Sequence, residues 1–478
     1  MSTDQAQAAT ADVHSAKLTT RLRVILAVVL IADVLDLMDS TITNIAAPTI
    51  VREIGGGQGL VKWLGASYAL AIGVLLVVGG RLGDRYGKRT MFIIGIAGFG
   101  LASVWCGLSA DPGMLVAGRL VQGGFGAVLI PQGIGLLLKT FSREQFPAAV
   151  AAFGPTLAGS AVLGPIVAGL IISANIGGLT WRPMFLINIV LAAIGLIAAI
   201  TLLPPDDDKR PEAIDIAGAV LLGAAMLGLI FGLIEGSTDG WHALPMASIA
   251  AGIVLFVAFA IRQRTAANPL ILPTLLANRG FTSGLLLGLA YFAAVNGFAY
   301  VISLFFQLSL HLSPVRASLG LSPLMVGIMI SAFITRPLIP KLGRTLVVLG
   351  LLVTLIGVAA LVITTAAASN HVNAWTMAPS IVVLGLGMGA CFSSIFDVAV
   401  GDVAPDEAGS ASGSLSAVQQ LAAAIGSAVV TTVFFDRLGH GGVDALRTSL
   451  TVVGVIVVAC LALVWLLPRK APDEEHAG

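Results

Sequence analysis

The chain has 478 residues, of which 57% are hydrophobic and 11% are charged, and its formal net charge at pH 7 is +1. This composition lies far outside that of soluble domains and indicates a protein that crosses a membrane many times. A net charge so close to zero, with no basic stripe, excludes a general attraction to nucleic acid. The cysteines, Cys106, Cys391 and Cys460, stand in apolar segments without C-x-x-C spacing, so neither a disulfide framework nor a metal site is predicted.

Apolar segments long enough to cross a bilayer, about 20 residues each, recur along the whole sequence. Most of the lysines and arginines fall in the loops on the side of the two ends, so both termini are expected in the cytoplasm. We expect fourteen spanning helices, near residues 23–50, 60–80, 91–110, 114–138, 147–172, 182–203, 214–234, 244–262, 281–307, 320–340, 345–366, 376–400, 410–435 and 447–467.

Two breaks in composition divide these helices into groups of six, two and six. The first is the charged, proline-rich tract from Pro204 to Pro211, and the second runs from Arg262 to Arg279. We therefore expect an all-α integral membrane fold with a cytoplasmic tail (1–22), an N-terminal six-helix bundle (23–203), a linker with two additional helices (204–264), a C-terminal six-helix bundle (265–468) and a second tail (469–478).

The first helix carries three acids, Asp33, Asp36 and Asp39, inside an apolar stretch. An ionised aspartate at the centre of a bilayer costs roughly 2.5–3.5 kcal/mol, so three of them cannot face lipid. At about 100° per residue the three positions span about 120° of the helix circumference, and Asn44 flanks the same stripe. The sequence therefore predicts an acidic, polar pathway through the membrane.

A short polar turn follows the second helix of each six-helix group. The first turn, GRLGDRYGKR, resembles the G-x-L-a-D-R-x-G-R-K signature of the major facilitator superfamily, which consists of two six-helix repeats that rock around a central cavity. An aspartate at this helix end can pair with arginines or with a helix N-terminus and so clamp the cavity, although the turn could instead only anchor the topology. The candidate gating residues are Gly80, Gly83, Asp84, Arg85, Gly87, Lys88 and Arg89.

Two further segments are similar to signatures of the same superfamily. Leu115 to Ala127 matches a signature with an intramembrane arginine, here Arg119, which cannot lose its proton and so demands a carboxylate, carbonyls or water as partner. Arg119 could couple proton binding to opening, or form a fixed ion pair between the first and fourth helices. Gly164 and Pro165 are the best-matching part of an antiporter signature and indicate a kinked, closely packed helix that either gates or only packs.

Four motifs in order resemble the fourteen-helix drug:proton antiporter branch of that superfamily. They are MDSTITNIAAP at the end of the first helix, WLGASYAL in the second, WRPMFLIN before the sixth, and the run from Gly409 to Gly426. The resemblance implies export in exchange for protons, and it places Asp39 at the acidic position of the branch signature. Asp33 and Asp36 are additional acids, so the proton stoichiometry does not carry over.

Polar and aromatic residues elsewhere could line a substrate site. Asp397 either sits solvated at the cytoplasmic rim or faces the acids of the first helix across the cavity. Core packing is the alternative for each of the aromatic residues. The candidate substrate-binding residues are Asp33, Asp36, Asn44, Tyr68, Tyr291, Asn296, Tyr300, Gln307, Asp397 and Gln419, and the candidate proton-coupling residues are Asp39, Asp36, Asp33 and Arg119.

These observations predict a proton-coupled antiporter that exports small amphipathic, cationic drugs or toxic compounds across the bacterial cytoplasmic membrane. A dedicated exporter of one antibiotic or metabolite is the nearest alternative. A membrane-embedded enzyme is remote, because the sequence contains no H-E-x-x-H, no G-x-S-x-G and no clustered histidines. No cofactor is expected, since the sequence lacks a nucleotide-binding loop and a proton gradient would supply the energy. The expected partners are a small-molecule substrate, protons and the lipid bilayer, with the chain acting as a monomer.

Overall fold

The computed structural model describes residues 19–142, 145–206, 214–367, 372–400, 403 and 407–468. Within these residues the secondary structure is helical, without a strand. The long helices are α2 (Thr20–Ile54), α3 (Gly57–Tyr86), α4 (Lys88–Gly107), α5 (Pro112–Thr140), α6 (Phe146–Ala174), α7 (Arg182–Leu202), α8 (Ile216–Asp239), α9 (Ala243–Thr265), α11 (Arg279–Leu304), α12 (Pro314–Thr335), α14 (Arg344–Ala367), α15 (Ala374–Val400), α16 (Ala408–Leu438) and α17 (Gly442–Leu463).

Short elements connect or extend these helices. A π-helical turn, Phe305–Ser309, continues α11, and single 3₁₀ turns occupy Ile176–Gly178 and Val464–Leu466. Two short helices, α10 (Pro273–Ala277) and α13 (Ile339–Leu342), lie in connections.

Twelve helices of the described part of the chain are long and apolar enough to cross a membrane. The other two long helices are α2, whose middle carries the three acids, and α6, which contributes a shorter apolar stretch, Leu163–Ala174. Each predicted segment overlaps a long helix, whereas the number of membrane crossings and the side on which the termini lie stay predictions.

One predicted helix, 320–340, is displaced along the chain. The observed α12 starts at Pro314, because the Ser313 side chain accepts a hydrogen bond from the Arg316 N–H and proline is favourable in the first helical turn. The helix ends at Thr335, because Pro337 follows closely and has no backbone N–H with which to continue the hydrogen-bond ladder. The cap at Ser313 and the proline at 337 thus set the two ends of α12, whereas the prediction of 320–340 relied on hydropathy alone.

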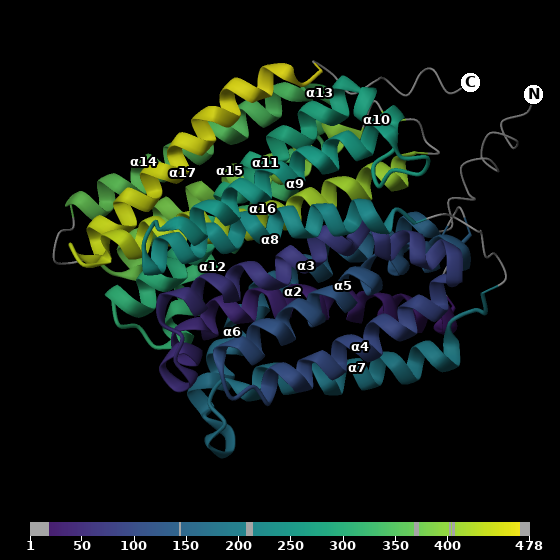
Figure 1. Ribbon diagram of the computed structural model, residues 1–478, viewed down its shortest axis with the longest axis horizontal. Helices are drawn as coiled ribbons and strands as arrows, with labels where there is room; N and C mark the ends of the chain where they lie inside the picture. The colour runs from purple at the N-terminus through teal and green to yellow at the C-terminus, as the bar shows by residue number, and fades with distance from the viewer. Residues whose placement is uncertain are drawn as a thin grey trace, which may run out of the picture.

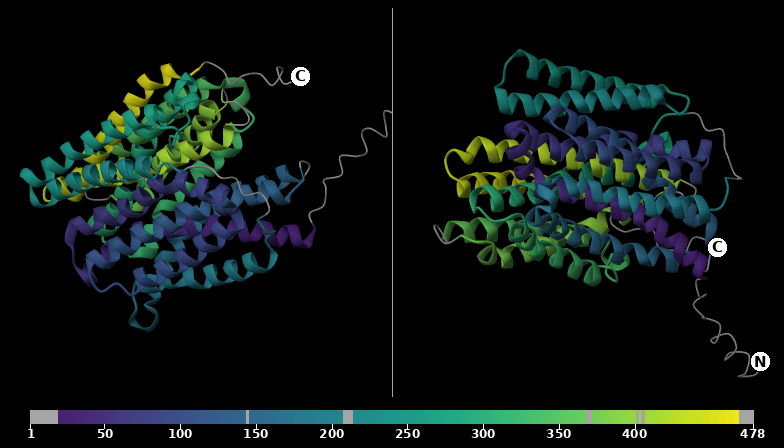
Figure 2. Two further views of the ribbon diagram at one scale, coloured as in Figure 1. Left: turned by 45° about the vertical axis from the view of Figure 1, so that its right-hand side comes forward. Right: turned by 90° about the horizontal axis from the view of Figure 1, so that it is seen from below.

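Two groups of helices make up the body of the molecule (Figure 1). Helices α2 to α7 form one group, hereafter the first bundle, and α11, α12 and α14 to α17 form the other, the second bundle. Helices α8 and α9 pair as an antiparallel hairpin that stands at one edge of the molecule, beside α3 and α16 (Figure 2, right). The N-terminal end of α2 and the C-terminal end of α17 lie at the same end of the bundles, which we call the termini end. The domain boundaries drawn from the sequence stay a prediction.

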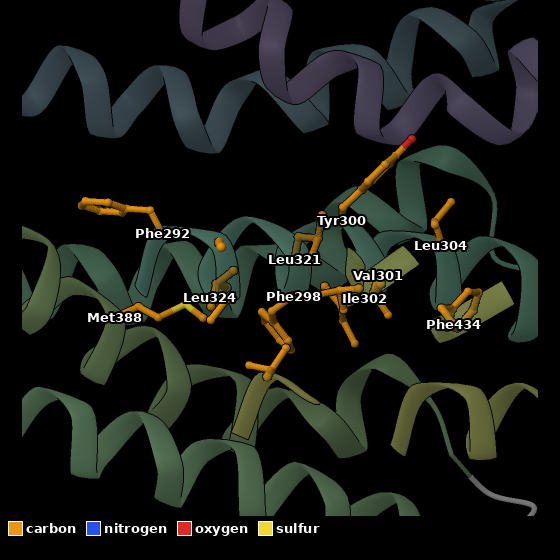
Figure 3. Packing of buried hydrophobic residues seen from close by; sticks show 14 of the residues in the cluster. Phe292, Phe298, Tyr300, Val301, Ile302, Leu304, Leu321, Leu324, Met388 and Phe434 are labelled. Atoms are coloured by element: carbon orange, nitrogen blue, oxygen red, sulfur yellow. The ribbon is translucent and has the colours of Figure 1, made fainter. Parts of the chain in front are cut away.

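Buried apolar side chains join the two bundles. One continuous cluster contains Ile45 and Phe185 from the first bundle together with Phe298 and Phe434 from the second. In Figure 3 the side chain of Tyr300 leaves this cluster and directs its hydroxyl toward the helices of the first bundle. The ring fits there because Gly65 of α3 has no side chain, and a Cβ at that position would lie 2.3 Å from the ring. The packing therefore positions the polar residues of α2 and α3 close to the plane between the bundles.

Candidate functional site

A buried ion pair between Asp39 of α2 and Arg119 of α5 forms the centre of the candidate site. Each side chain is 1% exposed. The other carboxylate oxygen of Asp39 accepts hydrogen bonds from Gln122 Nε2 and from Asn188 Nδ2, both at 2.8 Å. Because buried charges need a partner and satisfied hydrogen bonds, this set of donors is what an ionised Asp39 requires inside the bundle.

The same donors connect four helices around Asp39. Gln122 also receives a hydrogen bond from Arg119 at 2.8 Å and donates to Ser103 Oγ of α4 at 2.9 Å. Asn188 extends from α7 and also donates to Ser103 Oγ at 3.4 Å, so α5 and α7 bond directly to the α2 carboxylate and α4 joins the network through Ser103. The network fixes the geometry of the pair, since every described partner is itself bonded.

Two aromatic rings lie beside the Arg119 guanidinium. Its Cζ atom lies 4.2 Å from the centroid of the Tyr68 ring and 5.7 Å from that of Phe185. Such stacking stabilises a desolvated cation. The Nε of Arg119 is buried without a hydrogen-bond partner among the described residues, so the guanidinium retains a donor for another acceptor.

A second acid reaches the site through Tyr68. The Tyr68 hydroxyl donates a hydrogen bond of 2.5 Å to Asp36 Oδ1, one helical turn before Asp39. Asp33 lies a further turn away, half-buried, and its Oδ2 is buried without a partner among the described residues. The three acids of α2 thus face protein, as predicted, but their surroundings differ: Asp39 is paired with a cation, Asp36 has a tyrosine, and one oxygen of Asp33 has no partner within the described chain.

Sequence reasoning assigned no role to Gln122, Asn188 or Ser103. Gln122 and Asn188 lie inside motifs that were recognised, at the Q-G that follows Arg119 and at the end of W-R-x-x-F-x-I-N. A polar amide in an apolar helix needs a hydrogen-bond partner, so the sequence did indicate that Gln122 and Asn188 would bond to other polar groups. The partner itself could not be read from residues so far apart in the chain.

The remaining candidates for substrate contact come from α2, α11, α15, α16 and the π-helical turn after α11. Tyr291 is fully buried within the second bundle and donates to the Met388 carbonyl at 2.8 Å, whereas Tyr300 crosses between the bundles to donate to the Val61 carbonyl at 2.5 Å. Asp397 is exposed near the end of α15. The other four, all half-buried, are Asn44, Asn296, Gln307 and Gln419.

The predicted gating turn joins α3 to α4 at the termini end. Asp84 pairs with Lys88 across the turn at 3.4 Å, and each side chain is 38% exposed. Arg85 lies over the ring of Tyr86, with 5.3 Å between its Cζ atom and the ring centroid. Gly87 has a φ of +106°, which favours glycine, and Gly80 is half-buried beside α5.

The start of α4 is capped from a distant part of the chain. Asp206 accepts hydrogen bonds from the Arg89 N–H at 2.9 Å and the Thr90 N–H at 3.0 Å. The Arg89 side chain donates to the Ile200 carbonyl at 2.6 Å. A carboxylate at a helix N-terminus satisfies unpaired N–H groups and complements the helix dipole, so the tract after α7 also holds the gating turn.

Gly164 and Pro165 lie where α6 contacts α2 of its own bundle and α12 of the second bundle. A Cβ at Gly164 would lie 2.3 Å from Thr41 Oγ1 of α2, so the glycine permits the close approach of the two helices. The Pro165 carbonyl accepts a hydrogen bond of 2.5 Å from Ser318 Oγ of α12. The seam predicted from the Gly-Pro pair is therefore an interface between the bundles.

Hydrogen bonds between the bundles gather at the end opposite the termini. Tyr300 bonds to Val61 near the start of α3, and Ser303 donates to the Asn44 carbonyl at 3.1 Å. The bond from Ser318 to Pro165 is near the start of α12. The bundles are thus tied together on the side away from the gating turn.

Chemically, the site holds several acids and one fixed cation in a protein interior with aromatic walls. Such an arrangement can exchange protons or bind a cation, because the acids compete for one guanidinium. Within the described residues no group of three or more His, Cys, Asp or Glu side chains is arranged to hold a metal ion.

Comparison with known proteins identifies the family. The profile of the Major Facilitator Superfamily matches residues 29–427. A Streptomyces coelicolor protein described as "Probable actinorhodin transporter" is 40% identical over 441 residues, which are 90% of this chain and 76% of that protein. The multidrug efflux pump LfrA of Mycolicibacterium smegmatis is 29% identical over 417 residues, 87% of this chain and 81% of the pump.

The fold agrees with this match. The crystal structure of a D-xylose-proton symporter superimposes with a TM-score of 0.68, covering 94% of this chain and 99% of the symporter at 15% sequence identity. At that identity the likeness concerns the fold alone. The chain is a multi-pass membrane protein with the architecture of a transporter, and it belongs to the Major Facilitator Superfamily.

Proposed function

We propose that the protein exports small amphipathic, cationic compounds in exchange for protons. The observation that carries the proposal is the Asp39–Arg119 pair with Asp36 and Tyr68 beside it, enclosed among the helices of the first bundle. The relative described as a multidrug efflux pump supports the direction of transport. In this proposal the proton gradient is the energy source, no cofactor takes part, and all fourteen long helices cross the membrane with both termini in the cytoplasm.

The groups around Asp39, a guanidinium and two side-chain amides, all donate to its carboxyl oxygens, which is the arrangement that a charged carboxylate needs. A proton on this carboxyl group would remove the charge that Arg119 requires, and an unpaired buried charge costs about 3–5 kcal/mol. Protonation therefore releases Arg119, and the nearest acid able to accept it is Asp36, which Tyr68 already connects to the guanidinium. Substrate and proton then compete through one arginine, which is the basis of exchange.

Alternating access would convert this competition into transport. The bundles are tied at the end opposite the termini through Tyr300, Ser303 and Ser318, so the present conformation is closed on that side. For a protein with cytoplasmic termini, closure there keeps the site away from the external face. Release of Arg119 when Asp39 takes up a proton would favour the opposite conformation, since the seams at α2 and α6 adjoin the ion pair.

Transport by purified protein in liposomes tests the proposal. With a pH gradient imposed, addition of ethidium should dissipate the gradient in vesicles with the wild-type protein. Asp39→Asn should reduce this proton flux to the level of empty vesicles, while Asp436→Asn, whose side chain is 74% exposed in α16, should leave it unchanged. Ethidium movement that leaves the gradient intact in the wild-type protein would show a facilitator without proton coupling.

A dedicated exporter is the second candidate. The identity of 40% to a protein described as a transporter of one compound favours it over the weaker match to a multidrug pump. Competition for ethidium transport by a panel of unrelated cationic and neutral drugs distinguishes the two functions. Inhibition by many compounds supports the multidrug pump, whereas a single potent competitor supports the dedicated exporter.

A further inference from the structure

Three helices from different parts of the molecule share one buried seam. Side chains of α3, α8 and α16 form an apolar cluster, in which Leu70, Ile230 and Leu421 are typical members. The right-hand view of Figure 2 shows the α8–α9 hairpin beside the two bundles at this edge. Because α3 belongs to the first bundle and α16 to the second, α8 covers a line along which the bundles meet. The contacts of α8 therefore depend on how the two bundles are arranged.

A buried lysine stands at the end of this seam that lies opposite the termini. Lys62 of α3 is 0% exposed, and no carboxylate among the described residues lies within ion-pair distance of it. Its ammonium group instead donates hydrogen bonds to Ser237 Oγ at 2.7 Å and to Thr238 Oγ1 at 3.3 Å. Both hydroxyls belong to the last turn of α8, where the helix dipole favours a cation. A buried charge is costly without such partners, so Lys62 fixes this end of α8 to the first bundle.

The second bundle reaches one of the same hydroxyl groups. Thr432 of α16 donates a hydrogen bond of 3.1 Å to Ser237 Oγ. The Ser237 oxygen can accept from Lys62 and from Thr432 at once, because its own proton is donated to the Ile234 carbonyl at 2.9 Å. Lys62, Ser237 and Thr432 therefore form a continuous chain of hydrogen bonds from α3 through α8 to α16.

The two links of this chain differ in strength. The link between Lys62 and α8 involves a charge, and hydrogen bonds of charged groups contribute more than those of neutral groups. The link from Thr432 to Ser237 is neutral, and Thr432 shares its single proton with the Ala428 carbonyl, which lies 2.7 Å from Oγ1. If the bundles separate at this end, Thr432 keeps its bond within α16. The link between Thr432 and Ser237 is therefore the one that breaks first.

We propose that the hairpin is part of a latch that holds the bundles closed at the end opposite the termini. Lys62 fixes the end of α8 to the first bundle, and Thr432 of the second bundle bonds to Ser237 only while that end is closed. Lipid tails are as apolar as the seam, so a hydrogen bond between helices gains weight over apolar packing in a bilayer. The inference rests on the alternating access of the proposed function, but the latch involves neither protons nor substrate.

Distance measurements by double electron–electron resonance test the latch. The full-length protein, with its buried native cysteines replaced by alanine, carries nitroxide labels through Gln58→Cys at the start of α3 and His440→Cys after α16, both at exposed positions. In phospholipid nanodiscs, at a pH at which this reference protein shows a short and a long distance, the ratio of long to short reports opening. Thr432→Val keeps the shape of the side chain but removes the hydroxyl, so the ratio should rise by about fivefold, the effect of one neutral hydrogen bond.

Two further substitutions locate the effect. Thr431→Val should leave the ratio unchanged, because the hydroxyl of this neighbouring threonine bonds to carbonyls of α16 itself. Ser237→Ala should raise the ratio, and Thr432→Val added to it should have no further effect, since both remove one bond. An unchanged ratio in Thr432→Val, or additive effects in the double variant, would overturn the latch while leaving alternating access intact. A single distance in the reference protein at every pH would contradict alternating access itself, and the latch with it.

Discussion

The ring of Tyr68 lies against the guanidinium of Arg119, with 4.2 Å between the Arg119 Cζ atom and the ring centroid. The hydroxyl of the same tyrosine donates a hydrogen bond to Asp36. One side chain on α3 therefore contacts both the cation that pairs with Asp39 and the neighbouring acid. Through these two contacts, Tyr68 links the environment of Asp36 to that of the Asp39–Arg119 pair.

Removal of the Tyr68 hydroxyl separates these two contacts. Tyr68→Phe keeps the ring on Arg119 but loses the hydrogen bond to Asp36, which for a charged acceptor corresponds to about a tenfold loss of coupled transport. Tyr68→Leu also removes the cation–π contact and should lower the rate further. Initial rates of ethidium-driven proton flux in liposomes measure both effects, and equal rates for Phe and wild type would show that the hydroxyl plays no part.

The two additional acids of α2 are expected to serve cationic substrates. Asp36→Asn and Asp33→Asn each remove a charge without changing size, so transport of a cation such as ethidium should fall by about tenfold or more, and transport of a neutral drug such as chloramphenicol should fall less. Uptake assays on both compounds give the comparison. Equal losses for the cation and the neutral compound would exclude a role in recognising charge.

Close helix packing beneath the gating turn depends on Gly83. A Cβ at Gly83 would lie 1.8 Å from Gln132 Oε1 of α5, whereas one at Gly80 would meet nothing nearer than 3.8 Å. Gly83→Ala should therefore destabilise the protein by about 1–3 kcal/mol, and Gly80→Ala should be close to neutral. Cys106, Cys391 and Cys460 are all buried, so a thiol-reactive fluorescent dye reports thermal unfolding. Equal melting temperatures for the two variants would contradict the packing argument.

The start of α8 provides a pH-dependent contribution to stability. Burial by itself would raise the pKa of Asp215, but hydrogen bonds from Arg262 and the Gly218 N–H hold that pKa below its ordinary value. A lowered pKa in the folded state adds stability that is complete above the unfolded value of about 4 and is lost as the pH falls through the folded value.

Two substitutions at Asp215 check this contribution. Asp215→Ala removes the cap and should cost about 1 kcal/mol at pH 7, with the difference from wild type shrinking below pH 4. Asp215→Asn keeps a capping oxygen and should cost less. Melting temperatures measured across this pH range report the effect, and a deficit in the alanine variant that is independent of pH would rule out the carboxylate as its source.

The sequence predicted those features of the site that follow from the cost of placing a charged side chain in an apolar helix. Acids in an apolar helix had to face protein or water, and Arg119 required a carboxylate, carbonyls or water as its partner. A fixed ion pair between the first and fourth helices was therefore one of two interpretations reached from the residues, and the structure identifies Asp39 as the partner. Asn188 was not recognised as a partner, because 149 positions separate it from Asp39 and no local pattern encodes such a contact. The cap on α4 was missed for the same reason, since Asp206 lies in a tract that reads as a linker.

Helix positions could be predicted from the sequence where a run of apolar residues marks the whole helix. Segments with uniform apolar character coincide with long helices, whereas α12 begins and ends at capping and proline signals that a hydropathy window does not register. The placement of α8 and α9 beside α3 could not be predicted, because it depends on side chains such as Lys62 that contact distant residues.

Lys62 is fully buried in α3 and donates hydrogen bonds to Ser237 at 2.7 Å and Thr238 at 3.3 Å, near the end of α8. About 28 Å further along α3, at 1.5 Å per residue, Arg81 donates to backbone carbonyls of the connection after α9, including that of Asn268 at 3.3 Å. Hydrogen bonds thus attach the hairpin and the connection that follows it to α3 at two widely separated points. Ser237 also accepts a hydrogen bond of 3.1 Å from Thr432 of α16, so α8 contacts the second bundle as well. A tilt of the bundles against each other that keeps the two attachments to α3 must break this bond and bend the connection before α11.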